Sequence, residues 1–381
     1  MFITKDPEVE QMKMMVRNYV EKKVEPYAQQ IEDDDKIPQH VIDEAKELGL
    51  FGLSIPEEYG GIGLNTVGKA IILEQLGRTH NGFVSLISAH TGIGSTGLVQ
   101  LASPYLKEKF LPSLASGKKI AAFALSEPGA GSDATNLSTN AVKHGGKWLV
   151  NGTKHFITNA PIADVFTVFA VTDKEKGAKG GITAFLIEKG FPGFTVGKVD
   201  KKMGLRGSYT AQLIFDNCEV PDENVIGEVG MGYMSALKIL GEGRVGLAAR
   251  AVGSCDKLIE MSTAYAKERI QFGKPIADNQ AIQWMLADMA TETEAARMLT
   301  LKAAHMIDNG EKAIKEASMA KLFASDVFNR VADKAVQIHG GMGYVGEYPI
   351  ERFYRDARIT KIYEGTNEIQ RLIIARKLLE A

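Results

Sequence analysis

The chain has 381 residues, enough for two or three domains. Hydrophobic residues make up 45% and charged residues 24%, which is a globular composition and excludes a collagen-like or disordered chain. Lys and Arg number 45 against 47 Asp and Glu, so the net charge of −2 gives no electrostatic case for nucleic acid or an anionic membrane as a partner. The 39 glycines indicate that backbone approaches a small-molecule ligand closely.

The cysteines and the first residues bear on the compartment. Cys218 and Cys255 lie far apart, which favours a reducing compartment over a disulfide framework or a thiolate metal site. Residues 1–7 lack the apolar run of a signal peptide, so we expect the bacterial cytoplasm or, in a eukaryote, the mitochondrial matrix after loss of a transit peptide. Residues 79–106 carry no Asp, Glu, Lys or Arg, but polar residues and glycines interrupt them, which predicts protein interior and not a membrane span.

Residues 1–120 are predicted to form a helical domain. Gly49 ends an amphipathic run at 40–48, and Ser103 followed by Pro104 is typical of a helix start. The first helix shows helical spacing of apolar residues, which predicts one buried face formed by Met12, Met15, Val16, Tyr19, Val20 and Val24.

Residues 121–229 are predicted to form a middle β-domain, because the apolar period changes to two. Gly-Gly and Asn-Gly pairs separate the short runs and indicate hairpins, so we expect a mostly antiparallel sheet or barrel without helical crossovers. The runs predicted as strands are 121–125, 141–143, 148–150, 165–171, 182–187 and 211–215.

Residues 230–381 return to a helical period and predict a C-terminal antiparallel four-helix bundle. The fold class is therefore α+β with three segregated domains, and a doubly wound fold is excluded. The helical runs are 230–268, 277–309, 311–338 and 367–379.

Three glycine clusters imitate a dinucleotide-binding fingerprint, at 92–97, 129–134 and 341–346. The first is the best imitation because residues 83–88 could form a strand, but the helix after it, at 97–102, is too short for a crossover. We therefore set aside a Rossmann NAD site. The seven histidines show no ligand spacing, so no metal site is predicted, and no Gly-x-Ser-x-Gly elbow is present.

Two loops carry residue types suited to chemistry. The segment 127–133 has small side chains and free backbone N–H groups, which fit a ligand-binding loop or a simple glycine turn. In the segment 362–368, Thr366 is a candidate N-cap and Glu368 suits the helix dipole. Glu364 is suited neither to capping the helix nor to interacting with its dipole. It is either a desolvated carboxylate with a raised pKa, as a base requires, or an exposed loop residue.

Several segments together resemble the acyl-CoA dehydrogenase family over nearly the whole chain. The resemblance implies the same order of helical, β and helical domains, a homotetramer, and one FAD per subunit. The matching segments are 56–63, 123–133, 154–159, 267–273, 337–341, 354–358 and 362–371.

The resemblance also assigns site residues. It implies that the isoalloxazine ring is held by Phe123, Leu125, Ser126, Phe156, Ile157 and Thr158. It implies that the rest of FAD, partly across a subunit interface, is held by Arg269, Phe272, Gln280, Gln337, Ile338, Gly340, Gly341, Thr366, Asn367 and Glu368. It implies that acyl-CoA is bound by Ser132, Gly241, Glu242, Gly243, Arg244, Gly365 and Arg376.

The implied reaction is α,β-dehydrogenation of a short or short-branched acyl-CoA. Glu364 would remove the α-proton while the β-hydride passes to flavin N5, which leaves a trans-2-enoyl-CoA, and an electron-transfer flavoprotein would accept the electrons. The alternatives are an acyl-CoA oxidase that uses O₂, which usually carries a C-terminal extension, and a non-catalytic acyl-CoA-binding or assembly relative. Retention of Glu364 together with the FAD segments disfavours the last.

Two positions depart from patterns in the family. Phe156 stands where many members have Trp at the outer face of the flavin. Gly243 stands where some branched-chain members carry their base. The neighbouring Glu242 is turned by about 100° on a helix and is expected to point elsewhere.

Overall fold

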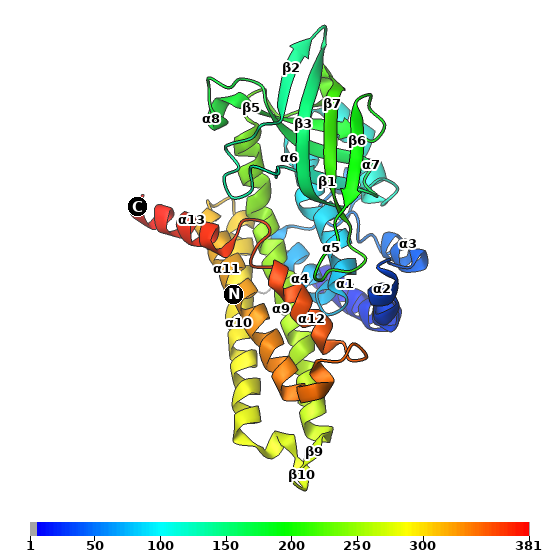
Figure 1. Cartoon of the computed structure of the whole chain (residues 1–381), viewed down its shortest axis with the longest axis vertical. Coiled ribbons are helices and arrows are strands. Elements are labelled where there is room, and N and C mark those ends of the chain that lie inside the picture. The colour runs from blue at the N-terminus through cyan, green and yellow to red at the C-terminus, as the bar shows by residue number, and fades with distance from the viewer. Residues whose placement is uncertain (1–5, 381) are drawn as a thin grey trace.

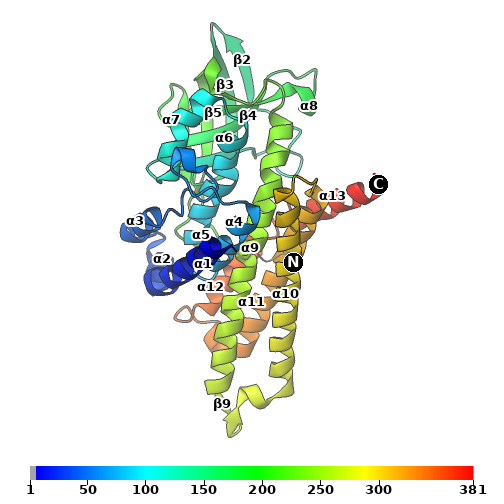
Figure 2. The ribbon, with the colours of Figure 1, turned by 180° about the vertical axis from the view of Figure 1, so that it is seen from behind.

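The computed structural model describes residues 6–380. A β-sheet lies at one end, a bundle of long helices extends to the other, and the N-terminal helices pack along one side of their junction (Figures 1 and 2). This is the predicted order of helical, β and helical parts. The chain begins with α1 (Pro7–Tyr19), α2 (Ala28–Asp34), α3 (Gln39–Glu47), α4 (Thr66–Leu76), α5 (Asn81–Ala89), α6 (Ser95–Leu101) and α7 (Pro104–Ala115).

The N-terminal helices begin and end where the sequence indicates. The Ser103 hydroxyl accepts a hydrogen bond from the Leu106 N–H and caps α7, and Gly49 has a φ of 73° just after α3. The predicted buried face of α1 is right except for Met15, which is 39% exposed. Met15 lies at the edge of the stripe that Met12 and Val16 bury against the core.

Most of the segment without charged residues is buried, as predicted, and only residues 103–105 near its end are exposed. Residues 83–88, considered above as a strand, lie in α5, and a one-turn π-helix (His90–Gly94) joins α5 to α6. The glycines at 92–97 therefore lie in the π-helix and in α6 and follow a helix, which removes the strand that a dinucleotide fingerprint requires.

The middle part is one eight-stranded sheet. Its strands are β1 (Ala121–Ala124), β2 (Asn140–His144), β3 (Lys147–Thr158), β4 (Val165–Val171), β5 (Ile182–Glu188), β6 (Phe194–Val199), β7 (Thr210–Pro221) and β8 (Val225–Ile226). They run in the order β6-β7-β3-β2-β4-β5-β8, with β1 beside β4, and α8 (Ala178–Gly181) lies between β4 and β5.

Most neighbouring strands are antiparallel, as the sequence predicts. Gly145 and Gly146, with φ of 56° and 80°, close the β2–β3 hairpin. β1 and β4 are parallel, with Ala121 opposite Val165, and β2 and β4 meet in the same direction at one residue pair. The crossover between β1 and β4 contains the β2–β3 hairpin, so an absence of helices did not exclude parallel pairing. β6 and β8 were not predicted.

The C-terminal part is built on α9 (Gly232–Glu268), α10 (Gln280–Asp308) and α11 (Ile314–His339). A small hairpin of β9 (Ile270–Gln271) and β10 (Lys274–Pro275) joins α9 to α10 at the far end of the bundle (Figure 1). α13 (Asn367–Leu379) packs on α11 and then points away from the bundle (Figure 1).

One bundle helix, α12 (Ile350–Ile359), was not predicted. Five of its ten residues are charged, and two of these, Arg352 and Asp356, are buried. Asp356 accepts a hydrogen bond from the Leu205 N–H, and Arg352 contacts Glu25, so the burial rests on tertiary pairing that a hydropathy pattern does not reveal.

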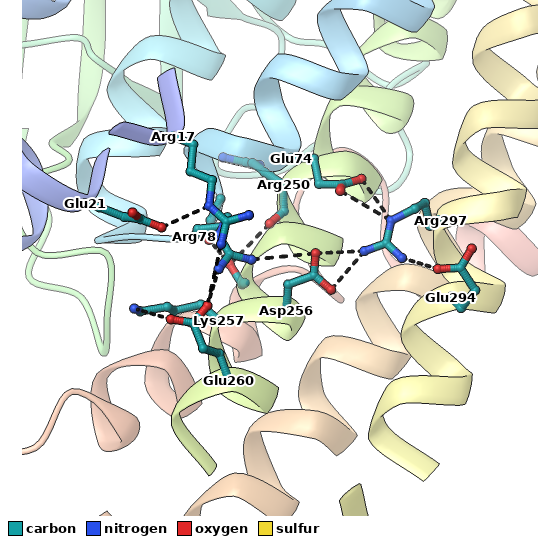
Figure 3. A network of polar contacts seen from close by, with 12 residues as sticks. Arg17, Glu21, Glu74, Arg78, Arg250, Asp256, Lys257, Glu260, Glu294 and Arg297 are labelled. Atoms are coloured by element: carbon teal, nitrogen blue, oxygen red, sulfur yellow. Dashed lines mark hydrogen bonds and ion pairs between the residues drawn. The ribbon is translucent and has the colours of Figure 1, made fainter. Parts of the chain in front are cut away.

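A polar network fixes the N-terminal helices against the bundle (Figure 3). Arg297 of α10 donates to both carboxylate oxygens of Asp256 on α9, at 2.8 and 2.7 Å, and to Glu74 of α4 at 3.3 Å. Arg78, after α4, ion-pairs with Asp256 and Glu260. α4 and α9 are therefore held together at the junction where the candidate site lies.

Within residues 6–380, none of the helices combines the length and the hydropathy that crossing a membrane requires.

Candidate active site

Glu364 lies in the turn between α12 and α13. Its φ of 54° and that of Gly365, 89°, reverse the chain, and the Gln370 side-chain amide donates to both of their carbonyls. The Thr366 hydroxyl accepts from the Ile369 N–H and caps α13, as predicted. The Glu364 side chain is 14% exposed, so it is not an exposed loop residue.

Burial raises the pKa of Glu364, and four cations oppose that rise. The nearest is Arg250 of α9, with its guanidinium 3.8 Å from Oε1. The others are Lys321, Arg244 and Lys69, on α11, α9 and α4. The carboxylate thus has the desolvation that a general base requires and a positive surrounding that keeps the ionised form accessible.

Gly243 provides room for the other carboxylate oxygen. A Cβ at this position would stand 2.6 Å from Oε2 of Glu364 and 2.8 Å from the Ile93 side chain. Oε2 is buried and has no hydrogen-bond partner within the described residues. A buried carboxylate oxygen without a donor is costly in free energy, and it is free to accept a proton from a ligand.

Glu242, next to Gly243, points to a different environment, as the helical geometry predicts. Its carboxylate accepts a hydrogen bond from the Gln100 side chain and lines a small cavity with Lys69 and Ser54. Lys69 is buried and donates to the Thr91 carbonyl and to Ser54.

Arg244 is buried, and its guanidinium donates to Ser318 on α11 at 3.5 Å. Gly241 has open space around its Cα. Ser132 and Arg376 are exposed, and Arg376 lies in the last turns of α13, about 13 Å along the helix from Asn367. Arg376 therefore lies well along α13 from the turn that carries Glu364.

The segments assigned to the flavin ring come together at one edge of the sheet. The His155 N–H donates to the Ser126 carbonyl at 2.9 Å, which joins β3 to the end of β1. The buried Lys154 ammonium holds the Leu125 carbonyl at 3.1 Å and Glu127 at 2.7 Å. Phe123 of β1 packs on the same hydrophobic cluster as Ile93. β1 also contacts the His90–Gly94 π-helix, whose Ile93 side chain lies beside Gly243, so this edge borders the Glu364 site.

This edge has the features that a flat aromatic cofactor requires. Phe156 lies at a bulge of β3, with a φ of 59°, and its ring is 66% exposed and stacked on His155 at 4.0 Å. Ile157 is buried, and Thr158 beside it is half-buried. An open aromatic face beside backbone polar groups fits FAD.

The residues assigned to the far part of FAD form a separate cluster near the β9–β10 end of the bundle. Phe272 is fully exposed, and Arg269, Gln280, Gln337, Gly340 and Gly341 are exposed as well. Ile338 is buried, so only its backbone can contact a ligand. Within one chain these residues do not join the Glu364 site.

The start of α13 lies between these regions. The Asn367 side chain is buried, accepts from Lys321 and Ser325, and donates to Asp326, while Glu368 is exposed. Asn367 therefore fixes the beginning of the helix, and its side chain is already used by the protein.

Four residues around Glu364 were not predicted from the sequence, namely Arg250, Lys69, Lys321 and Tyr363. Arg250 interrupts an Ala- and Val-rich stretch of α9, which was the available signal for a buried charge. Lys69 and Lys321 are single lysines that resemble surface positions. Within residues 6–380, no group of three His, Cys, Asp or Glu side chains could hold a metal ion.

The chain matches three domains described for acyl-CoA dehydrogenases. These are the N-terminal domain over residues 6–118, the middle domain over 122–218 and the C-terminal domain over 230–379. It is 47% identical over 368 residues to an acyl-CoA dehydrogenase of Bacillus subtilis (strain 168), covering 97% of each chain. It is 44% identical to the mitochondrial short-chain specific acyl-CoA dehydrogenase of Homo sapiens, covering 98% of this chain and 91% of the relative.

A solved structure, butyryl-CoA dehydrogenase from Megasphaera elsdenii, has the same fold. It superposes with a TM-score of 0.96 at 40% identity and covers 99% of each chain.

Proposed function

The chain belongs to the acyl-CoA dehydrogenase family of FAD-dependent oxidoreductases, and we propose that it oxidises a short-chain acyl-CoA thioester with Glu364 as the base. The observation that carries this proposal is the buried Oε2 of Glu364, which has no hydrogen-bond partner among residues 6–380 and lies against Gly243.

Glu364 has the electrostatic setting for removing a weakly acidic α-proton. Its raised pKa makes the carboxylate a stronger base than an exposed glutamate, and the surrounding cations stabilise negative charge in the site. We assign the backbone N–H of Glu364 to the thioester oxygen, where charge develops as the proton leaves. A bound acyl chain would exclude water and strengthen both effects.

FAD, when bound, supplies the acceptor for the hydride that leaves the β-carbon. We propose that the Leu125–Ser126 backbone and the 156–158 segment hold its ring. Arg269 and the start of α13, whose N–H groups favour an anion, would hold its phosphates. Because the residues near Arg269 and those near Phe156 do not meet in one chain, we propose that each FAD lies between two subunits of a homotetramer.

Short-chain substrates and an electron-transfer flavoprotein are proposed from the relatives. The human relative is named short-chain specific, and the Megasphaera elsdenii structure is named for butyryl-CoA. The exposed ring of Phe156 is where we propose that electrons leave for the flavoprotein. The 241–244 stretch would bind CoA, with Ser132 and Arg376 completing its contacts.

An absorbance spectrum tests the proposal most simply. The purified protein should be yellow with oxidised-flavin bands that bleach under anaerobic conditions on addition of butyryl-CoA. A panel of straight and branched acyl-CoAs of increasing length would then identify the substrate. A flavin-loaded protein that no acyl-CoA bleaches would contradict the proposal and favour the non-catalytic alternative, whereas fast reoxidation by O₂ would favour an oxidase.

A further inference from the structure

Arg250 is a buried cation that the family-based assignment leaves without a role. It lies on α9 and is 7% exposed. One guanidinium nitrogen donates to the Ser88 hydroxyl and the other to the Tyr363 hydroxyl, both at 2.8 Å. The guanidinium also lies 5.2 Å from the centre of the Tyr363 ring. These contacts from α5 and from the residue before Glu364 fix the position of the charge.

The fixed charge faces one oxygen of the base. Arg250 lies 3.8 Å from Oε1 of Glu364, whereas Oε2 faces Gly243. Arg250 and Gly243 are seven residues apart, which is about two turns or 10 Å along one face of α9. The helix therefore presents a cation to one carboxylate oxygen and the bare Cα of Gly243 to the other.

The distance between the Arg250 guanidinium and the Glu364 carboxylate matters for the chemistry. At 3.8 Å the pair attracts without a hydrogen bond, so Arg250 orients the carboxylate and takes up no lone pair. In a desolvated site such an attraction is only weakly screened, and it also favours the ionised form of the base.

Two of the other cations near Glu364 are hydrogen-bonded to other groups. Lys321 donates to the Gly365 carbonyl and to Asn367, and Lys69 donates to the Thr91 carbonyl. Within residues 6–380, Arg250 is the one side chain that ion-pairs directly with Glu364. The groups that face Glu364 from the surrounding elements are Arg244 and Arg250 of α9, Lys321 of α11, Lys69 of α4, and its neighbour Tyr363, with Glu242 beside Lys69.

We propose that Arg250 is a positioning residue for the base: it holds Oε1 of Glu364 from a fixed site on Ser88 and Tyr363, so that Oε2 faces the substrate's α-carbon. This inference rests on the proposed function for its catalytic meaning, but the Arg250–Glu364 coupling can be measured separately.

The test compares Arg250→Met, which removes the charge, with Arg250→Lys, which keeps it. Single-turnover bleaching by butyryl-CoA is measured from low to high pH at matched FAD content. Because ionised Glu364 is the active form, loss of the nearby cation moves the inflection of the rate to higher pH. We expect Arg250→Met to be about 10- to 100-fold slower at pH 7. Arg250→Lys should keep an inflection near that of the wild type and regain part of the rate.

Lys257→Met is the matched control. Lys257 lies two turns further along α9 and is paired with Glu260, so its loss removes a paired cation from the same helix far from Glu364. Its pH profile should equal that of the wild type. Should Arg250→Met not fold, Arg250→Gln also removes the charge and keeps donors for Ser88 and Tyr363.

A second readout does not depend on activity. The midpoint of thermal unfolding is measured against pH for the wild type, Arg250→Met, Glu364→Gln and the double variant. Because its folded pKa is raised, Glu364 contributes stability that is lost as pH rises through that pKa. Removing Arg250 should move this loss of stability to higher pH. In the Glu364→Gln background, Arg250→Met should no longer change the pH dependence of the unfolding midpoint.

A folded, flavin-loaded Arg250→Met with an unchanged inflection in rate would overturn the inference. An effect confined to the half-saturating acyl-CoA concentration would also overturn it, because that would make Arg250 a substrate contact. The failure of the proposed function would look different. In that case none of the acyl-CoAs tested would bleach the flavin of the wild type, but the unfolding profiles would still show that Arg250 and Glu364 are coupled.

Discussion

Oε2 of Glu364 lies 2.6 Å from the point where a Cβ on Gly243 would stand, although the two residues are 121 positions apart in the chain (364 − 243). A glycine within a helix costs about 1 kcal/mol relative to alanine, and this contact gives the reason for it. Any larger side chain at 243 would enter the space into which the carboxylate points.

The contact predicts that the base can be moved from one position to the other. In Glu364→Gly combined with Gly243→Glu, the new side chain starts beside the space that the old carboxylate occupied. We expect this double variant to bleach flavin faster than Glu364→Gly alone, although more slowly than the wild type. Glu242 should not compensate in Glu364→Gly, because it faces Gln100.

Single-turnover bleaching at matched FAD content measures this prediction. Gly243→Ala in the wild-type background is the control for crowding, and it should slow bleaching while the protein stays folded. A folded double variant no faster than Glu364→Gly would show that position 243 does not face the reacting carbon.

The second prediction concerns the buried ion pair of Lys154 and Glu127, beside the sheet edge that we propose holds the flavin ring. The side chains of Lys154 and Glu127 are 0% and 1% exposed, so removing the cation leaves an unpaired buried carboxylate. Lys154→Met should therefore lower the free energy of unfolding by about 3–5 kcal/mol and weaken FAD retention. The double variant Lys154→Met with Glu127→Gln should recover part of the lost stability and part of the FAD retention. Thermal unfolding measures the first, and the flavin-to-protein ratio measures the second.

The same pair predicts a pH dependence. Burial would raise the pKa of Glu127, but the Lys154 ammonium and the hydrogen bonds from Ser138 and Thr139 lower it to about 2. A depressed folded pKa contributes stability above the ordinary value of 4.5 that is lost as pH falls toward 2. Wild-type stability should fall over this range more steeply than that of Glu127→Gln. Parallel curves would contradict the assignment.

The third prediction separates cofactor binding from folding. Arg269 is exposed at the end of α9, and we assign it to a phosphate of FAD. Arg269→Ala should lose flavin during gel filtration and keep a wild-type unfolding midpoint in the absence of FAD. Lys267→Ala, which removes a nearby exposed cation, should keep its flavin. A fully loaded Arg269→Ala would refute the role.

Local patterns predicted the features that local chemistry determines. The Thr366 cap, the β2–β3 turn and the position of Glu364 outside a helix follow from residue type and spacing. The fold order follows from the change in apolar period. The flavin segments and the role of Glu364 required the resemblance to a family, because no spacing identifies them.

Features that depend on tertiary pairing were not predictable. α12 contains buried charges, so its pattern is that of a polar segment. Arg250 and Lys69 are buried because partners from other elements satisfy them, and nothing adjacent in the chain indicates those partners. β1 pairs with β4 across an intervening hairpin, which a strand pattern does not specify.

The central claim is that Glu364 is the base, and Glu364→Gln tests it most directly because it keeps the shape of the side chain and removes its basicity. The measurement is the rate of single-turnover flavin bleaching by butyryl-CoA, at FAD content matched to the wild type. We expect an intact, flavin-loaded protein that bleaches about 10²- to 10⁴-fold more slowly. Bleaching by the variant at near the wild-type rate would contradict it.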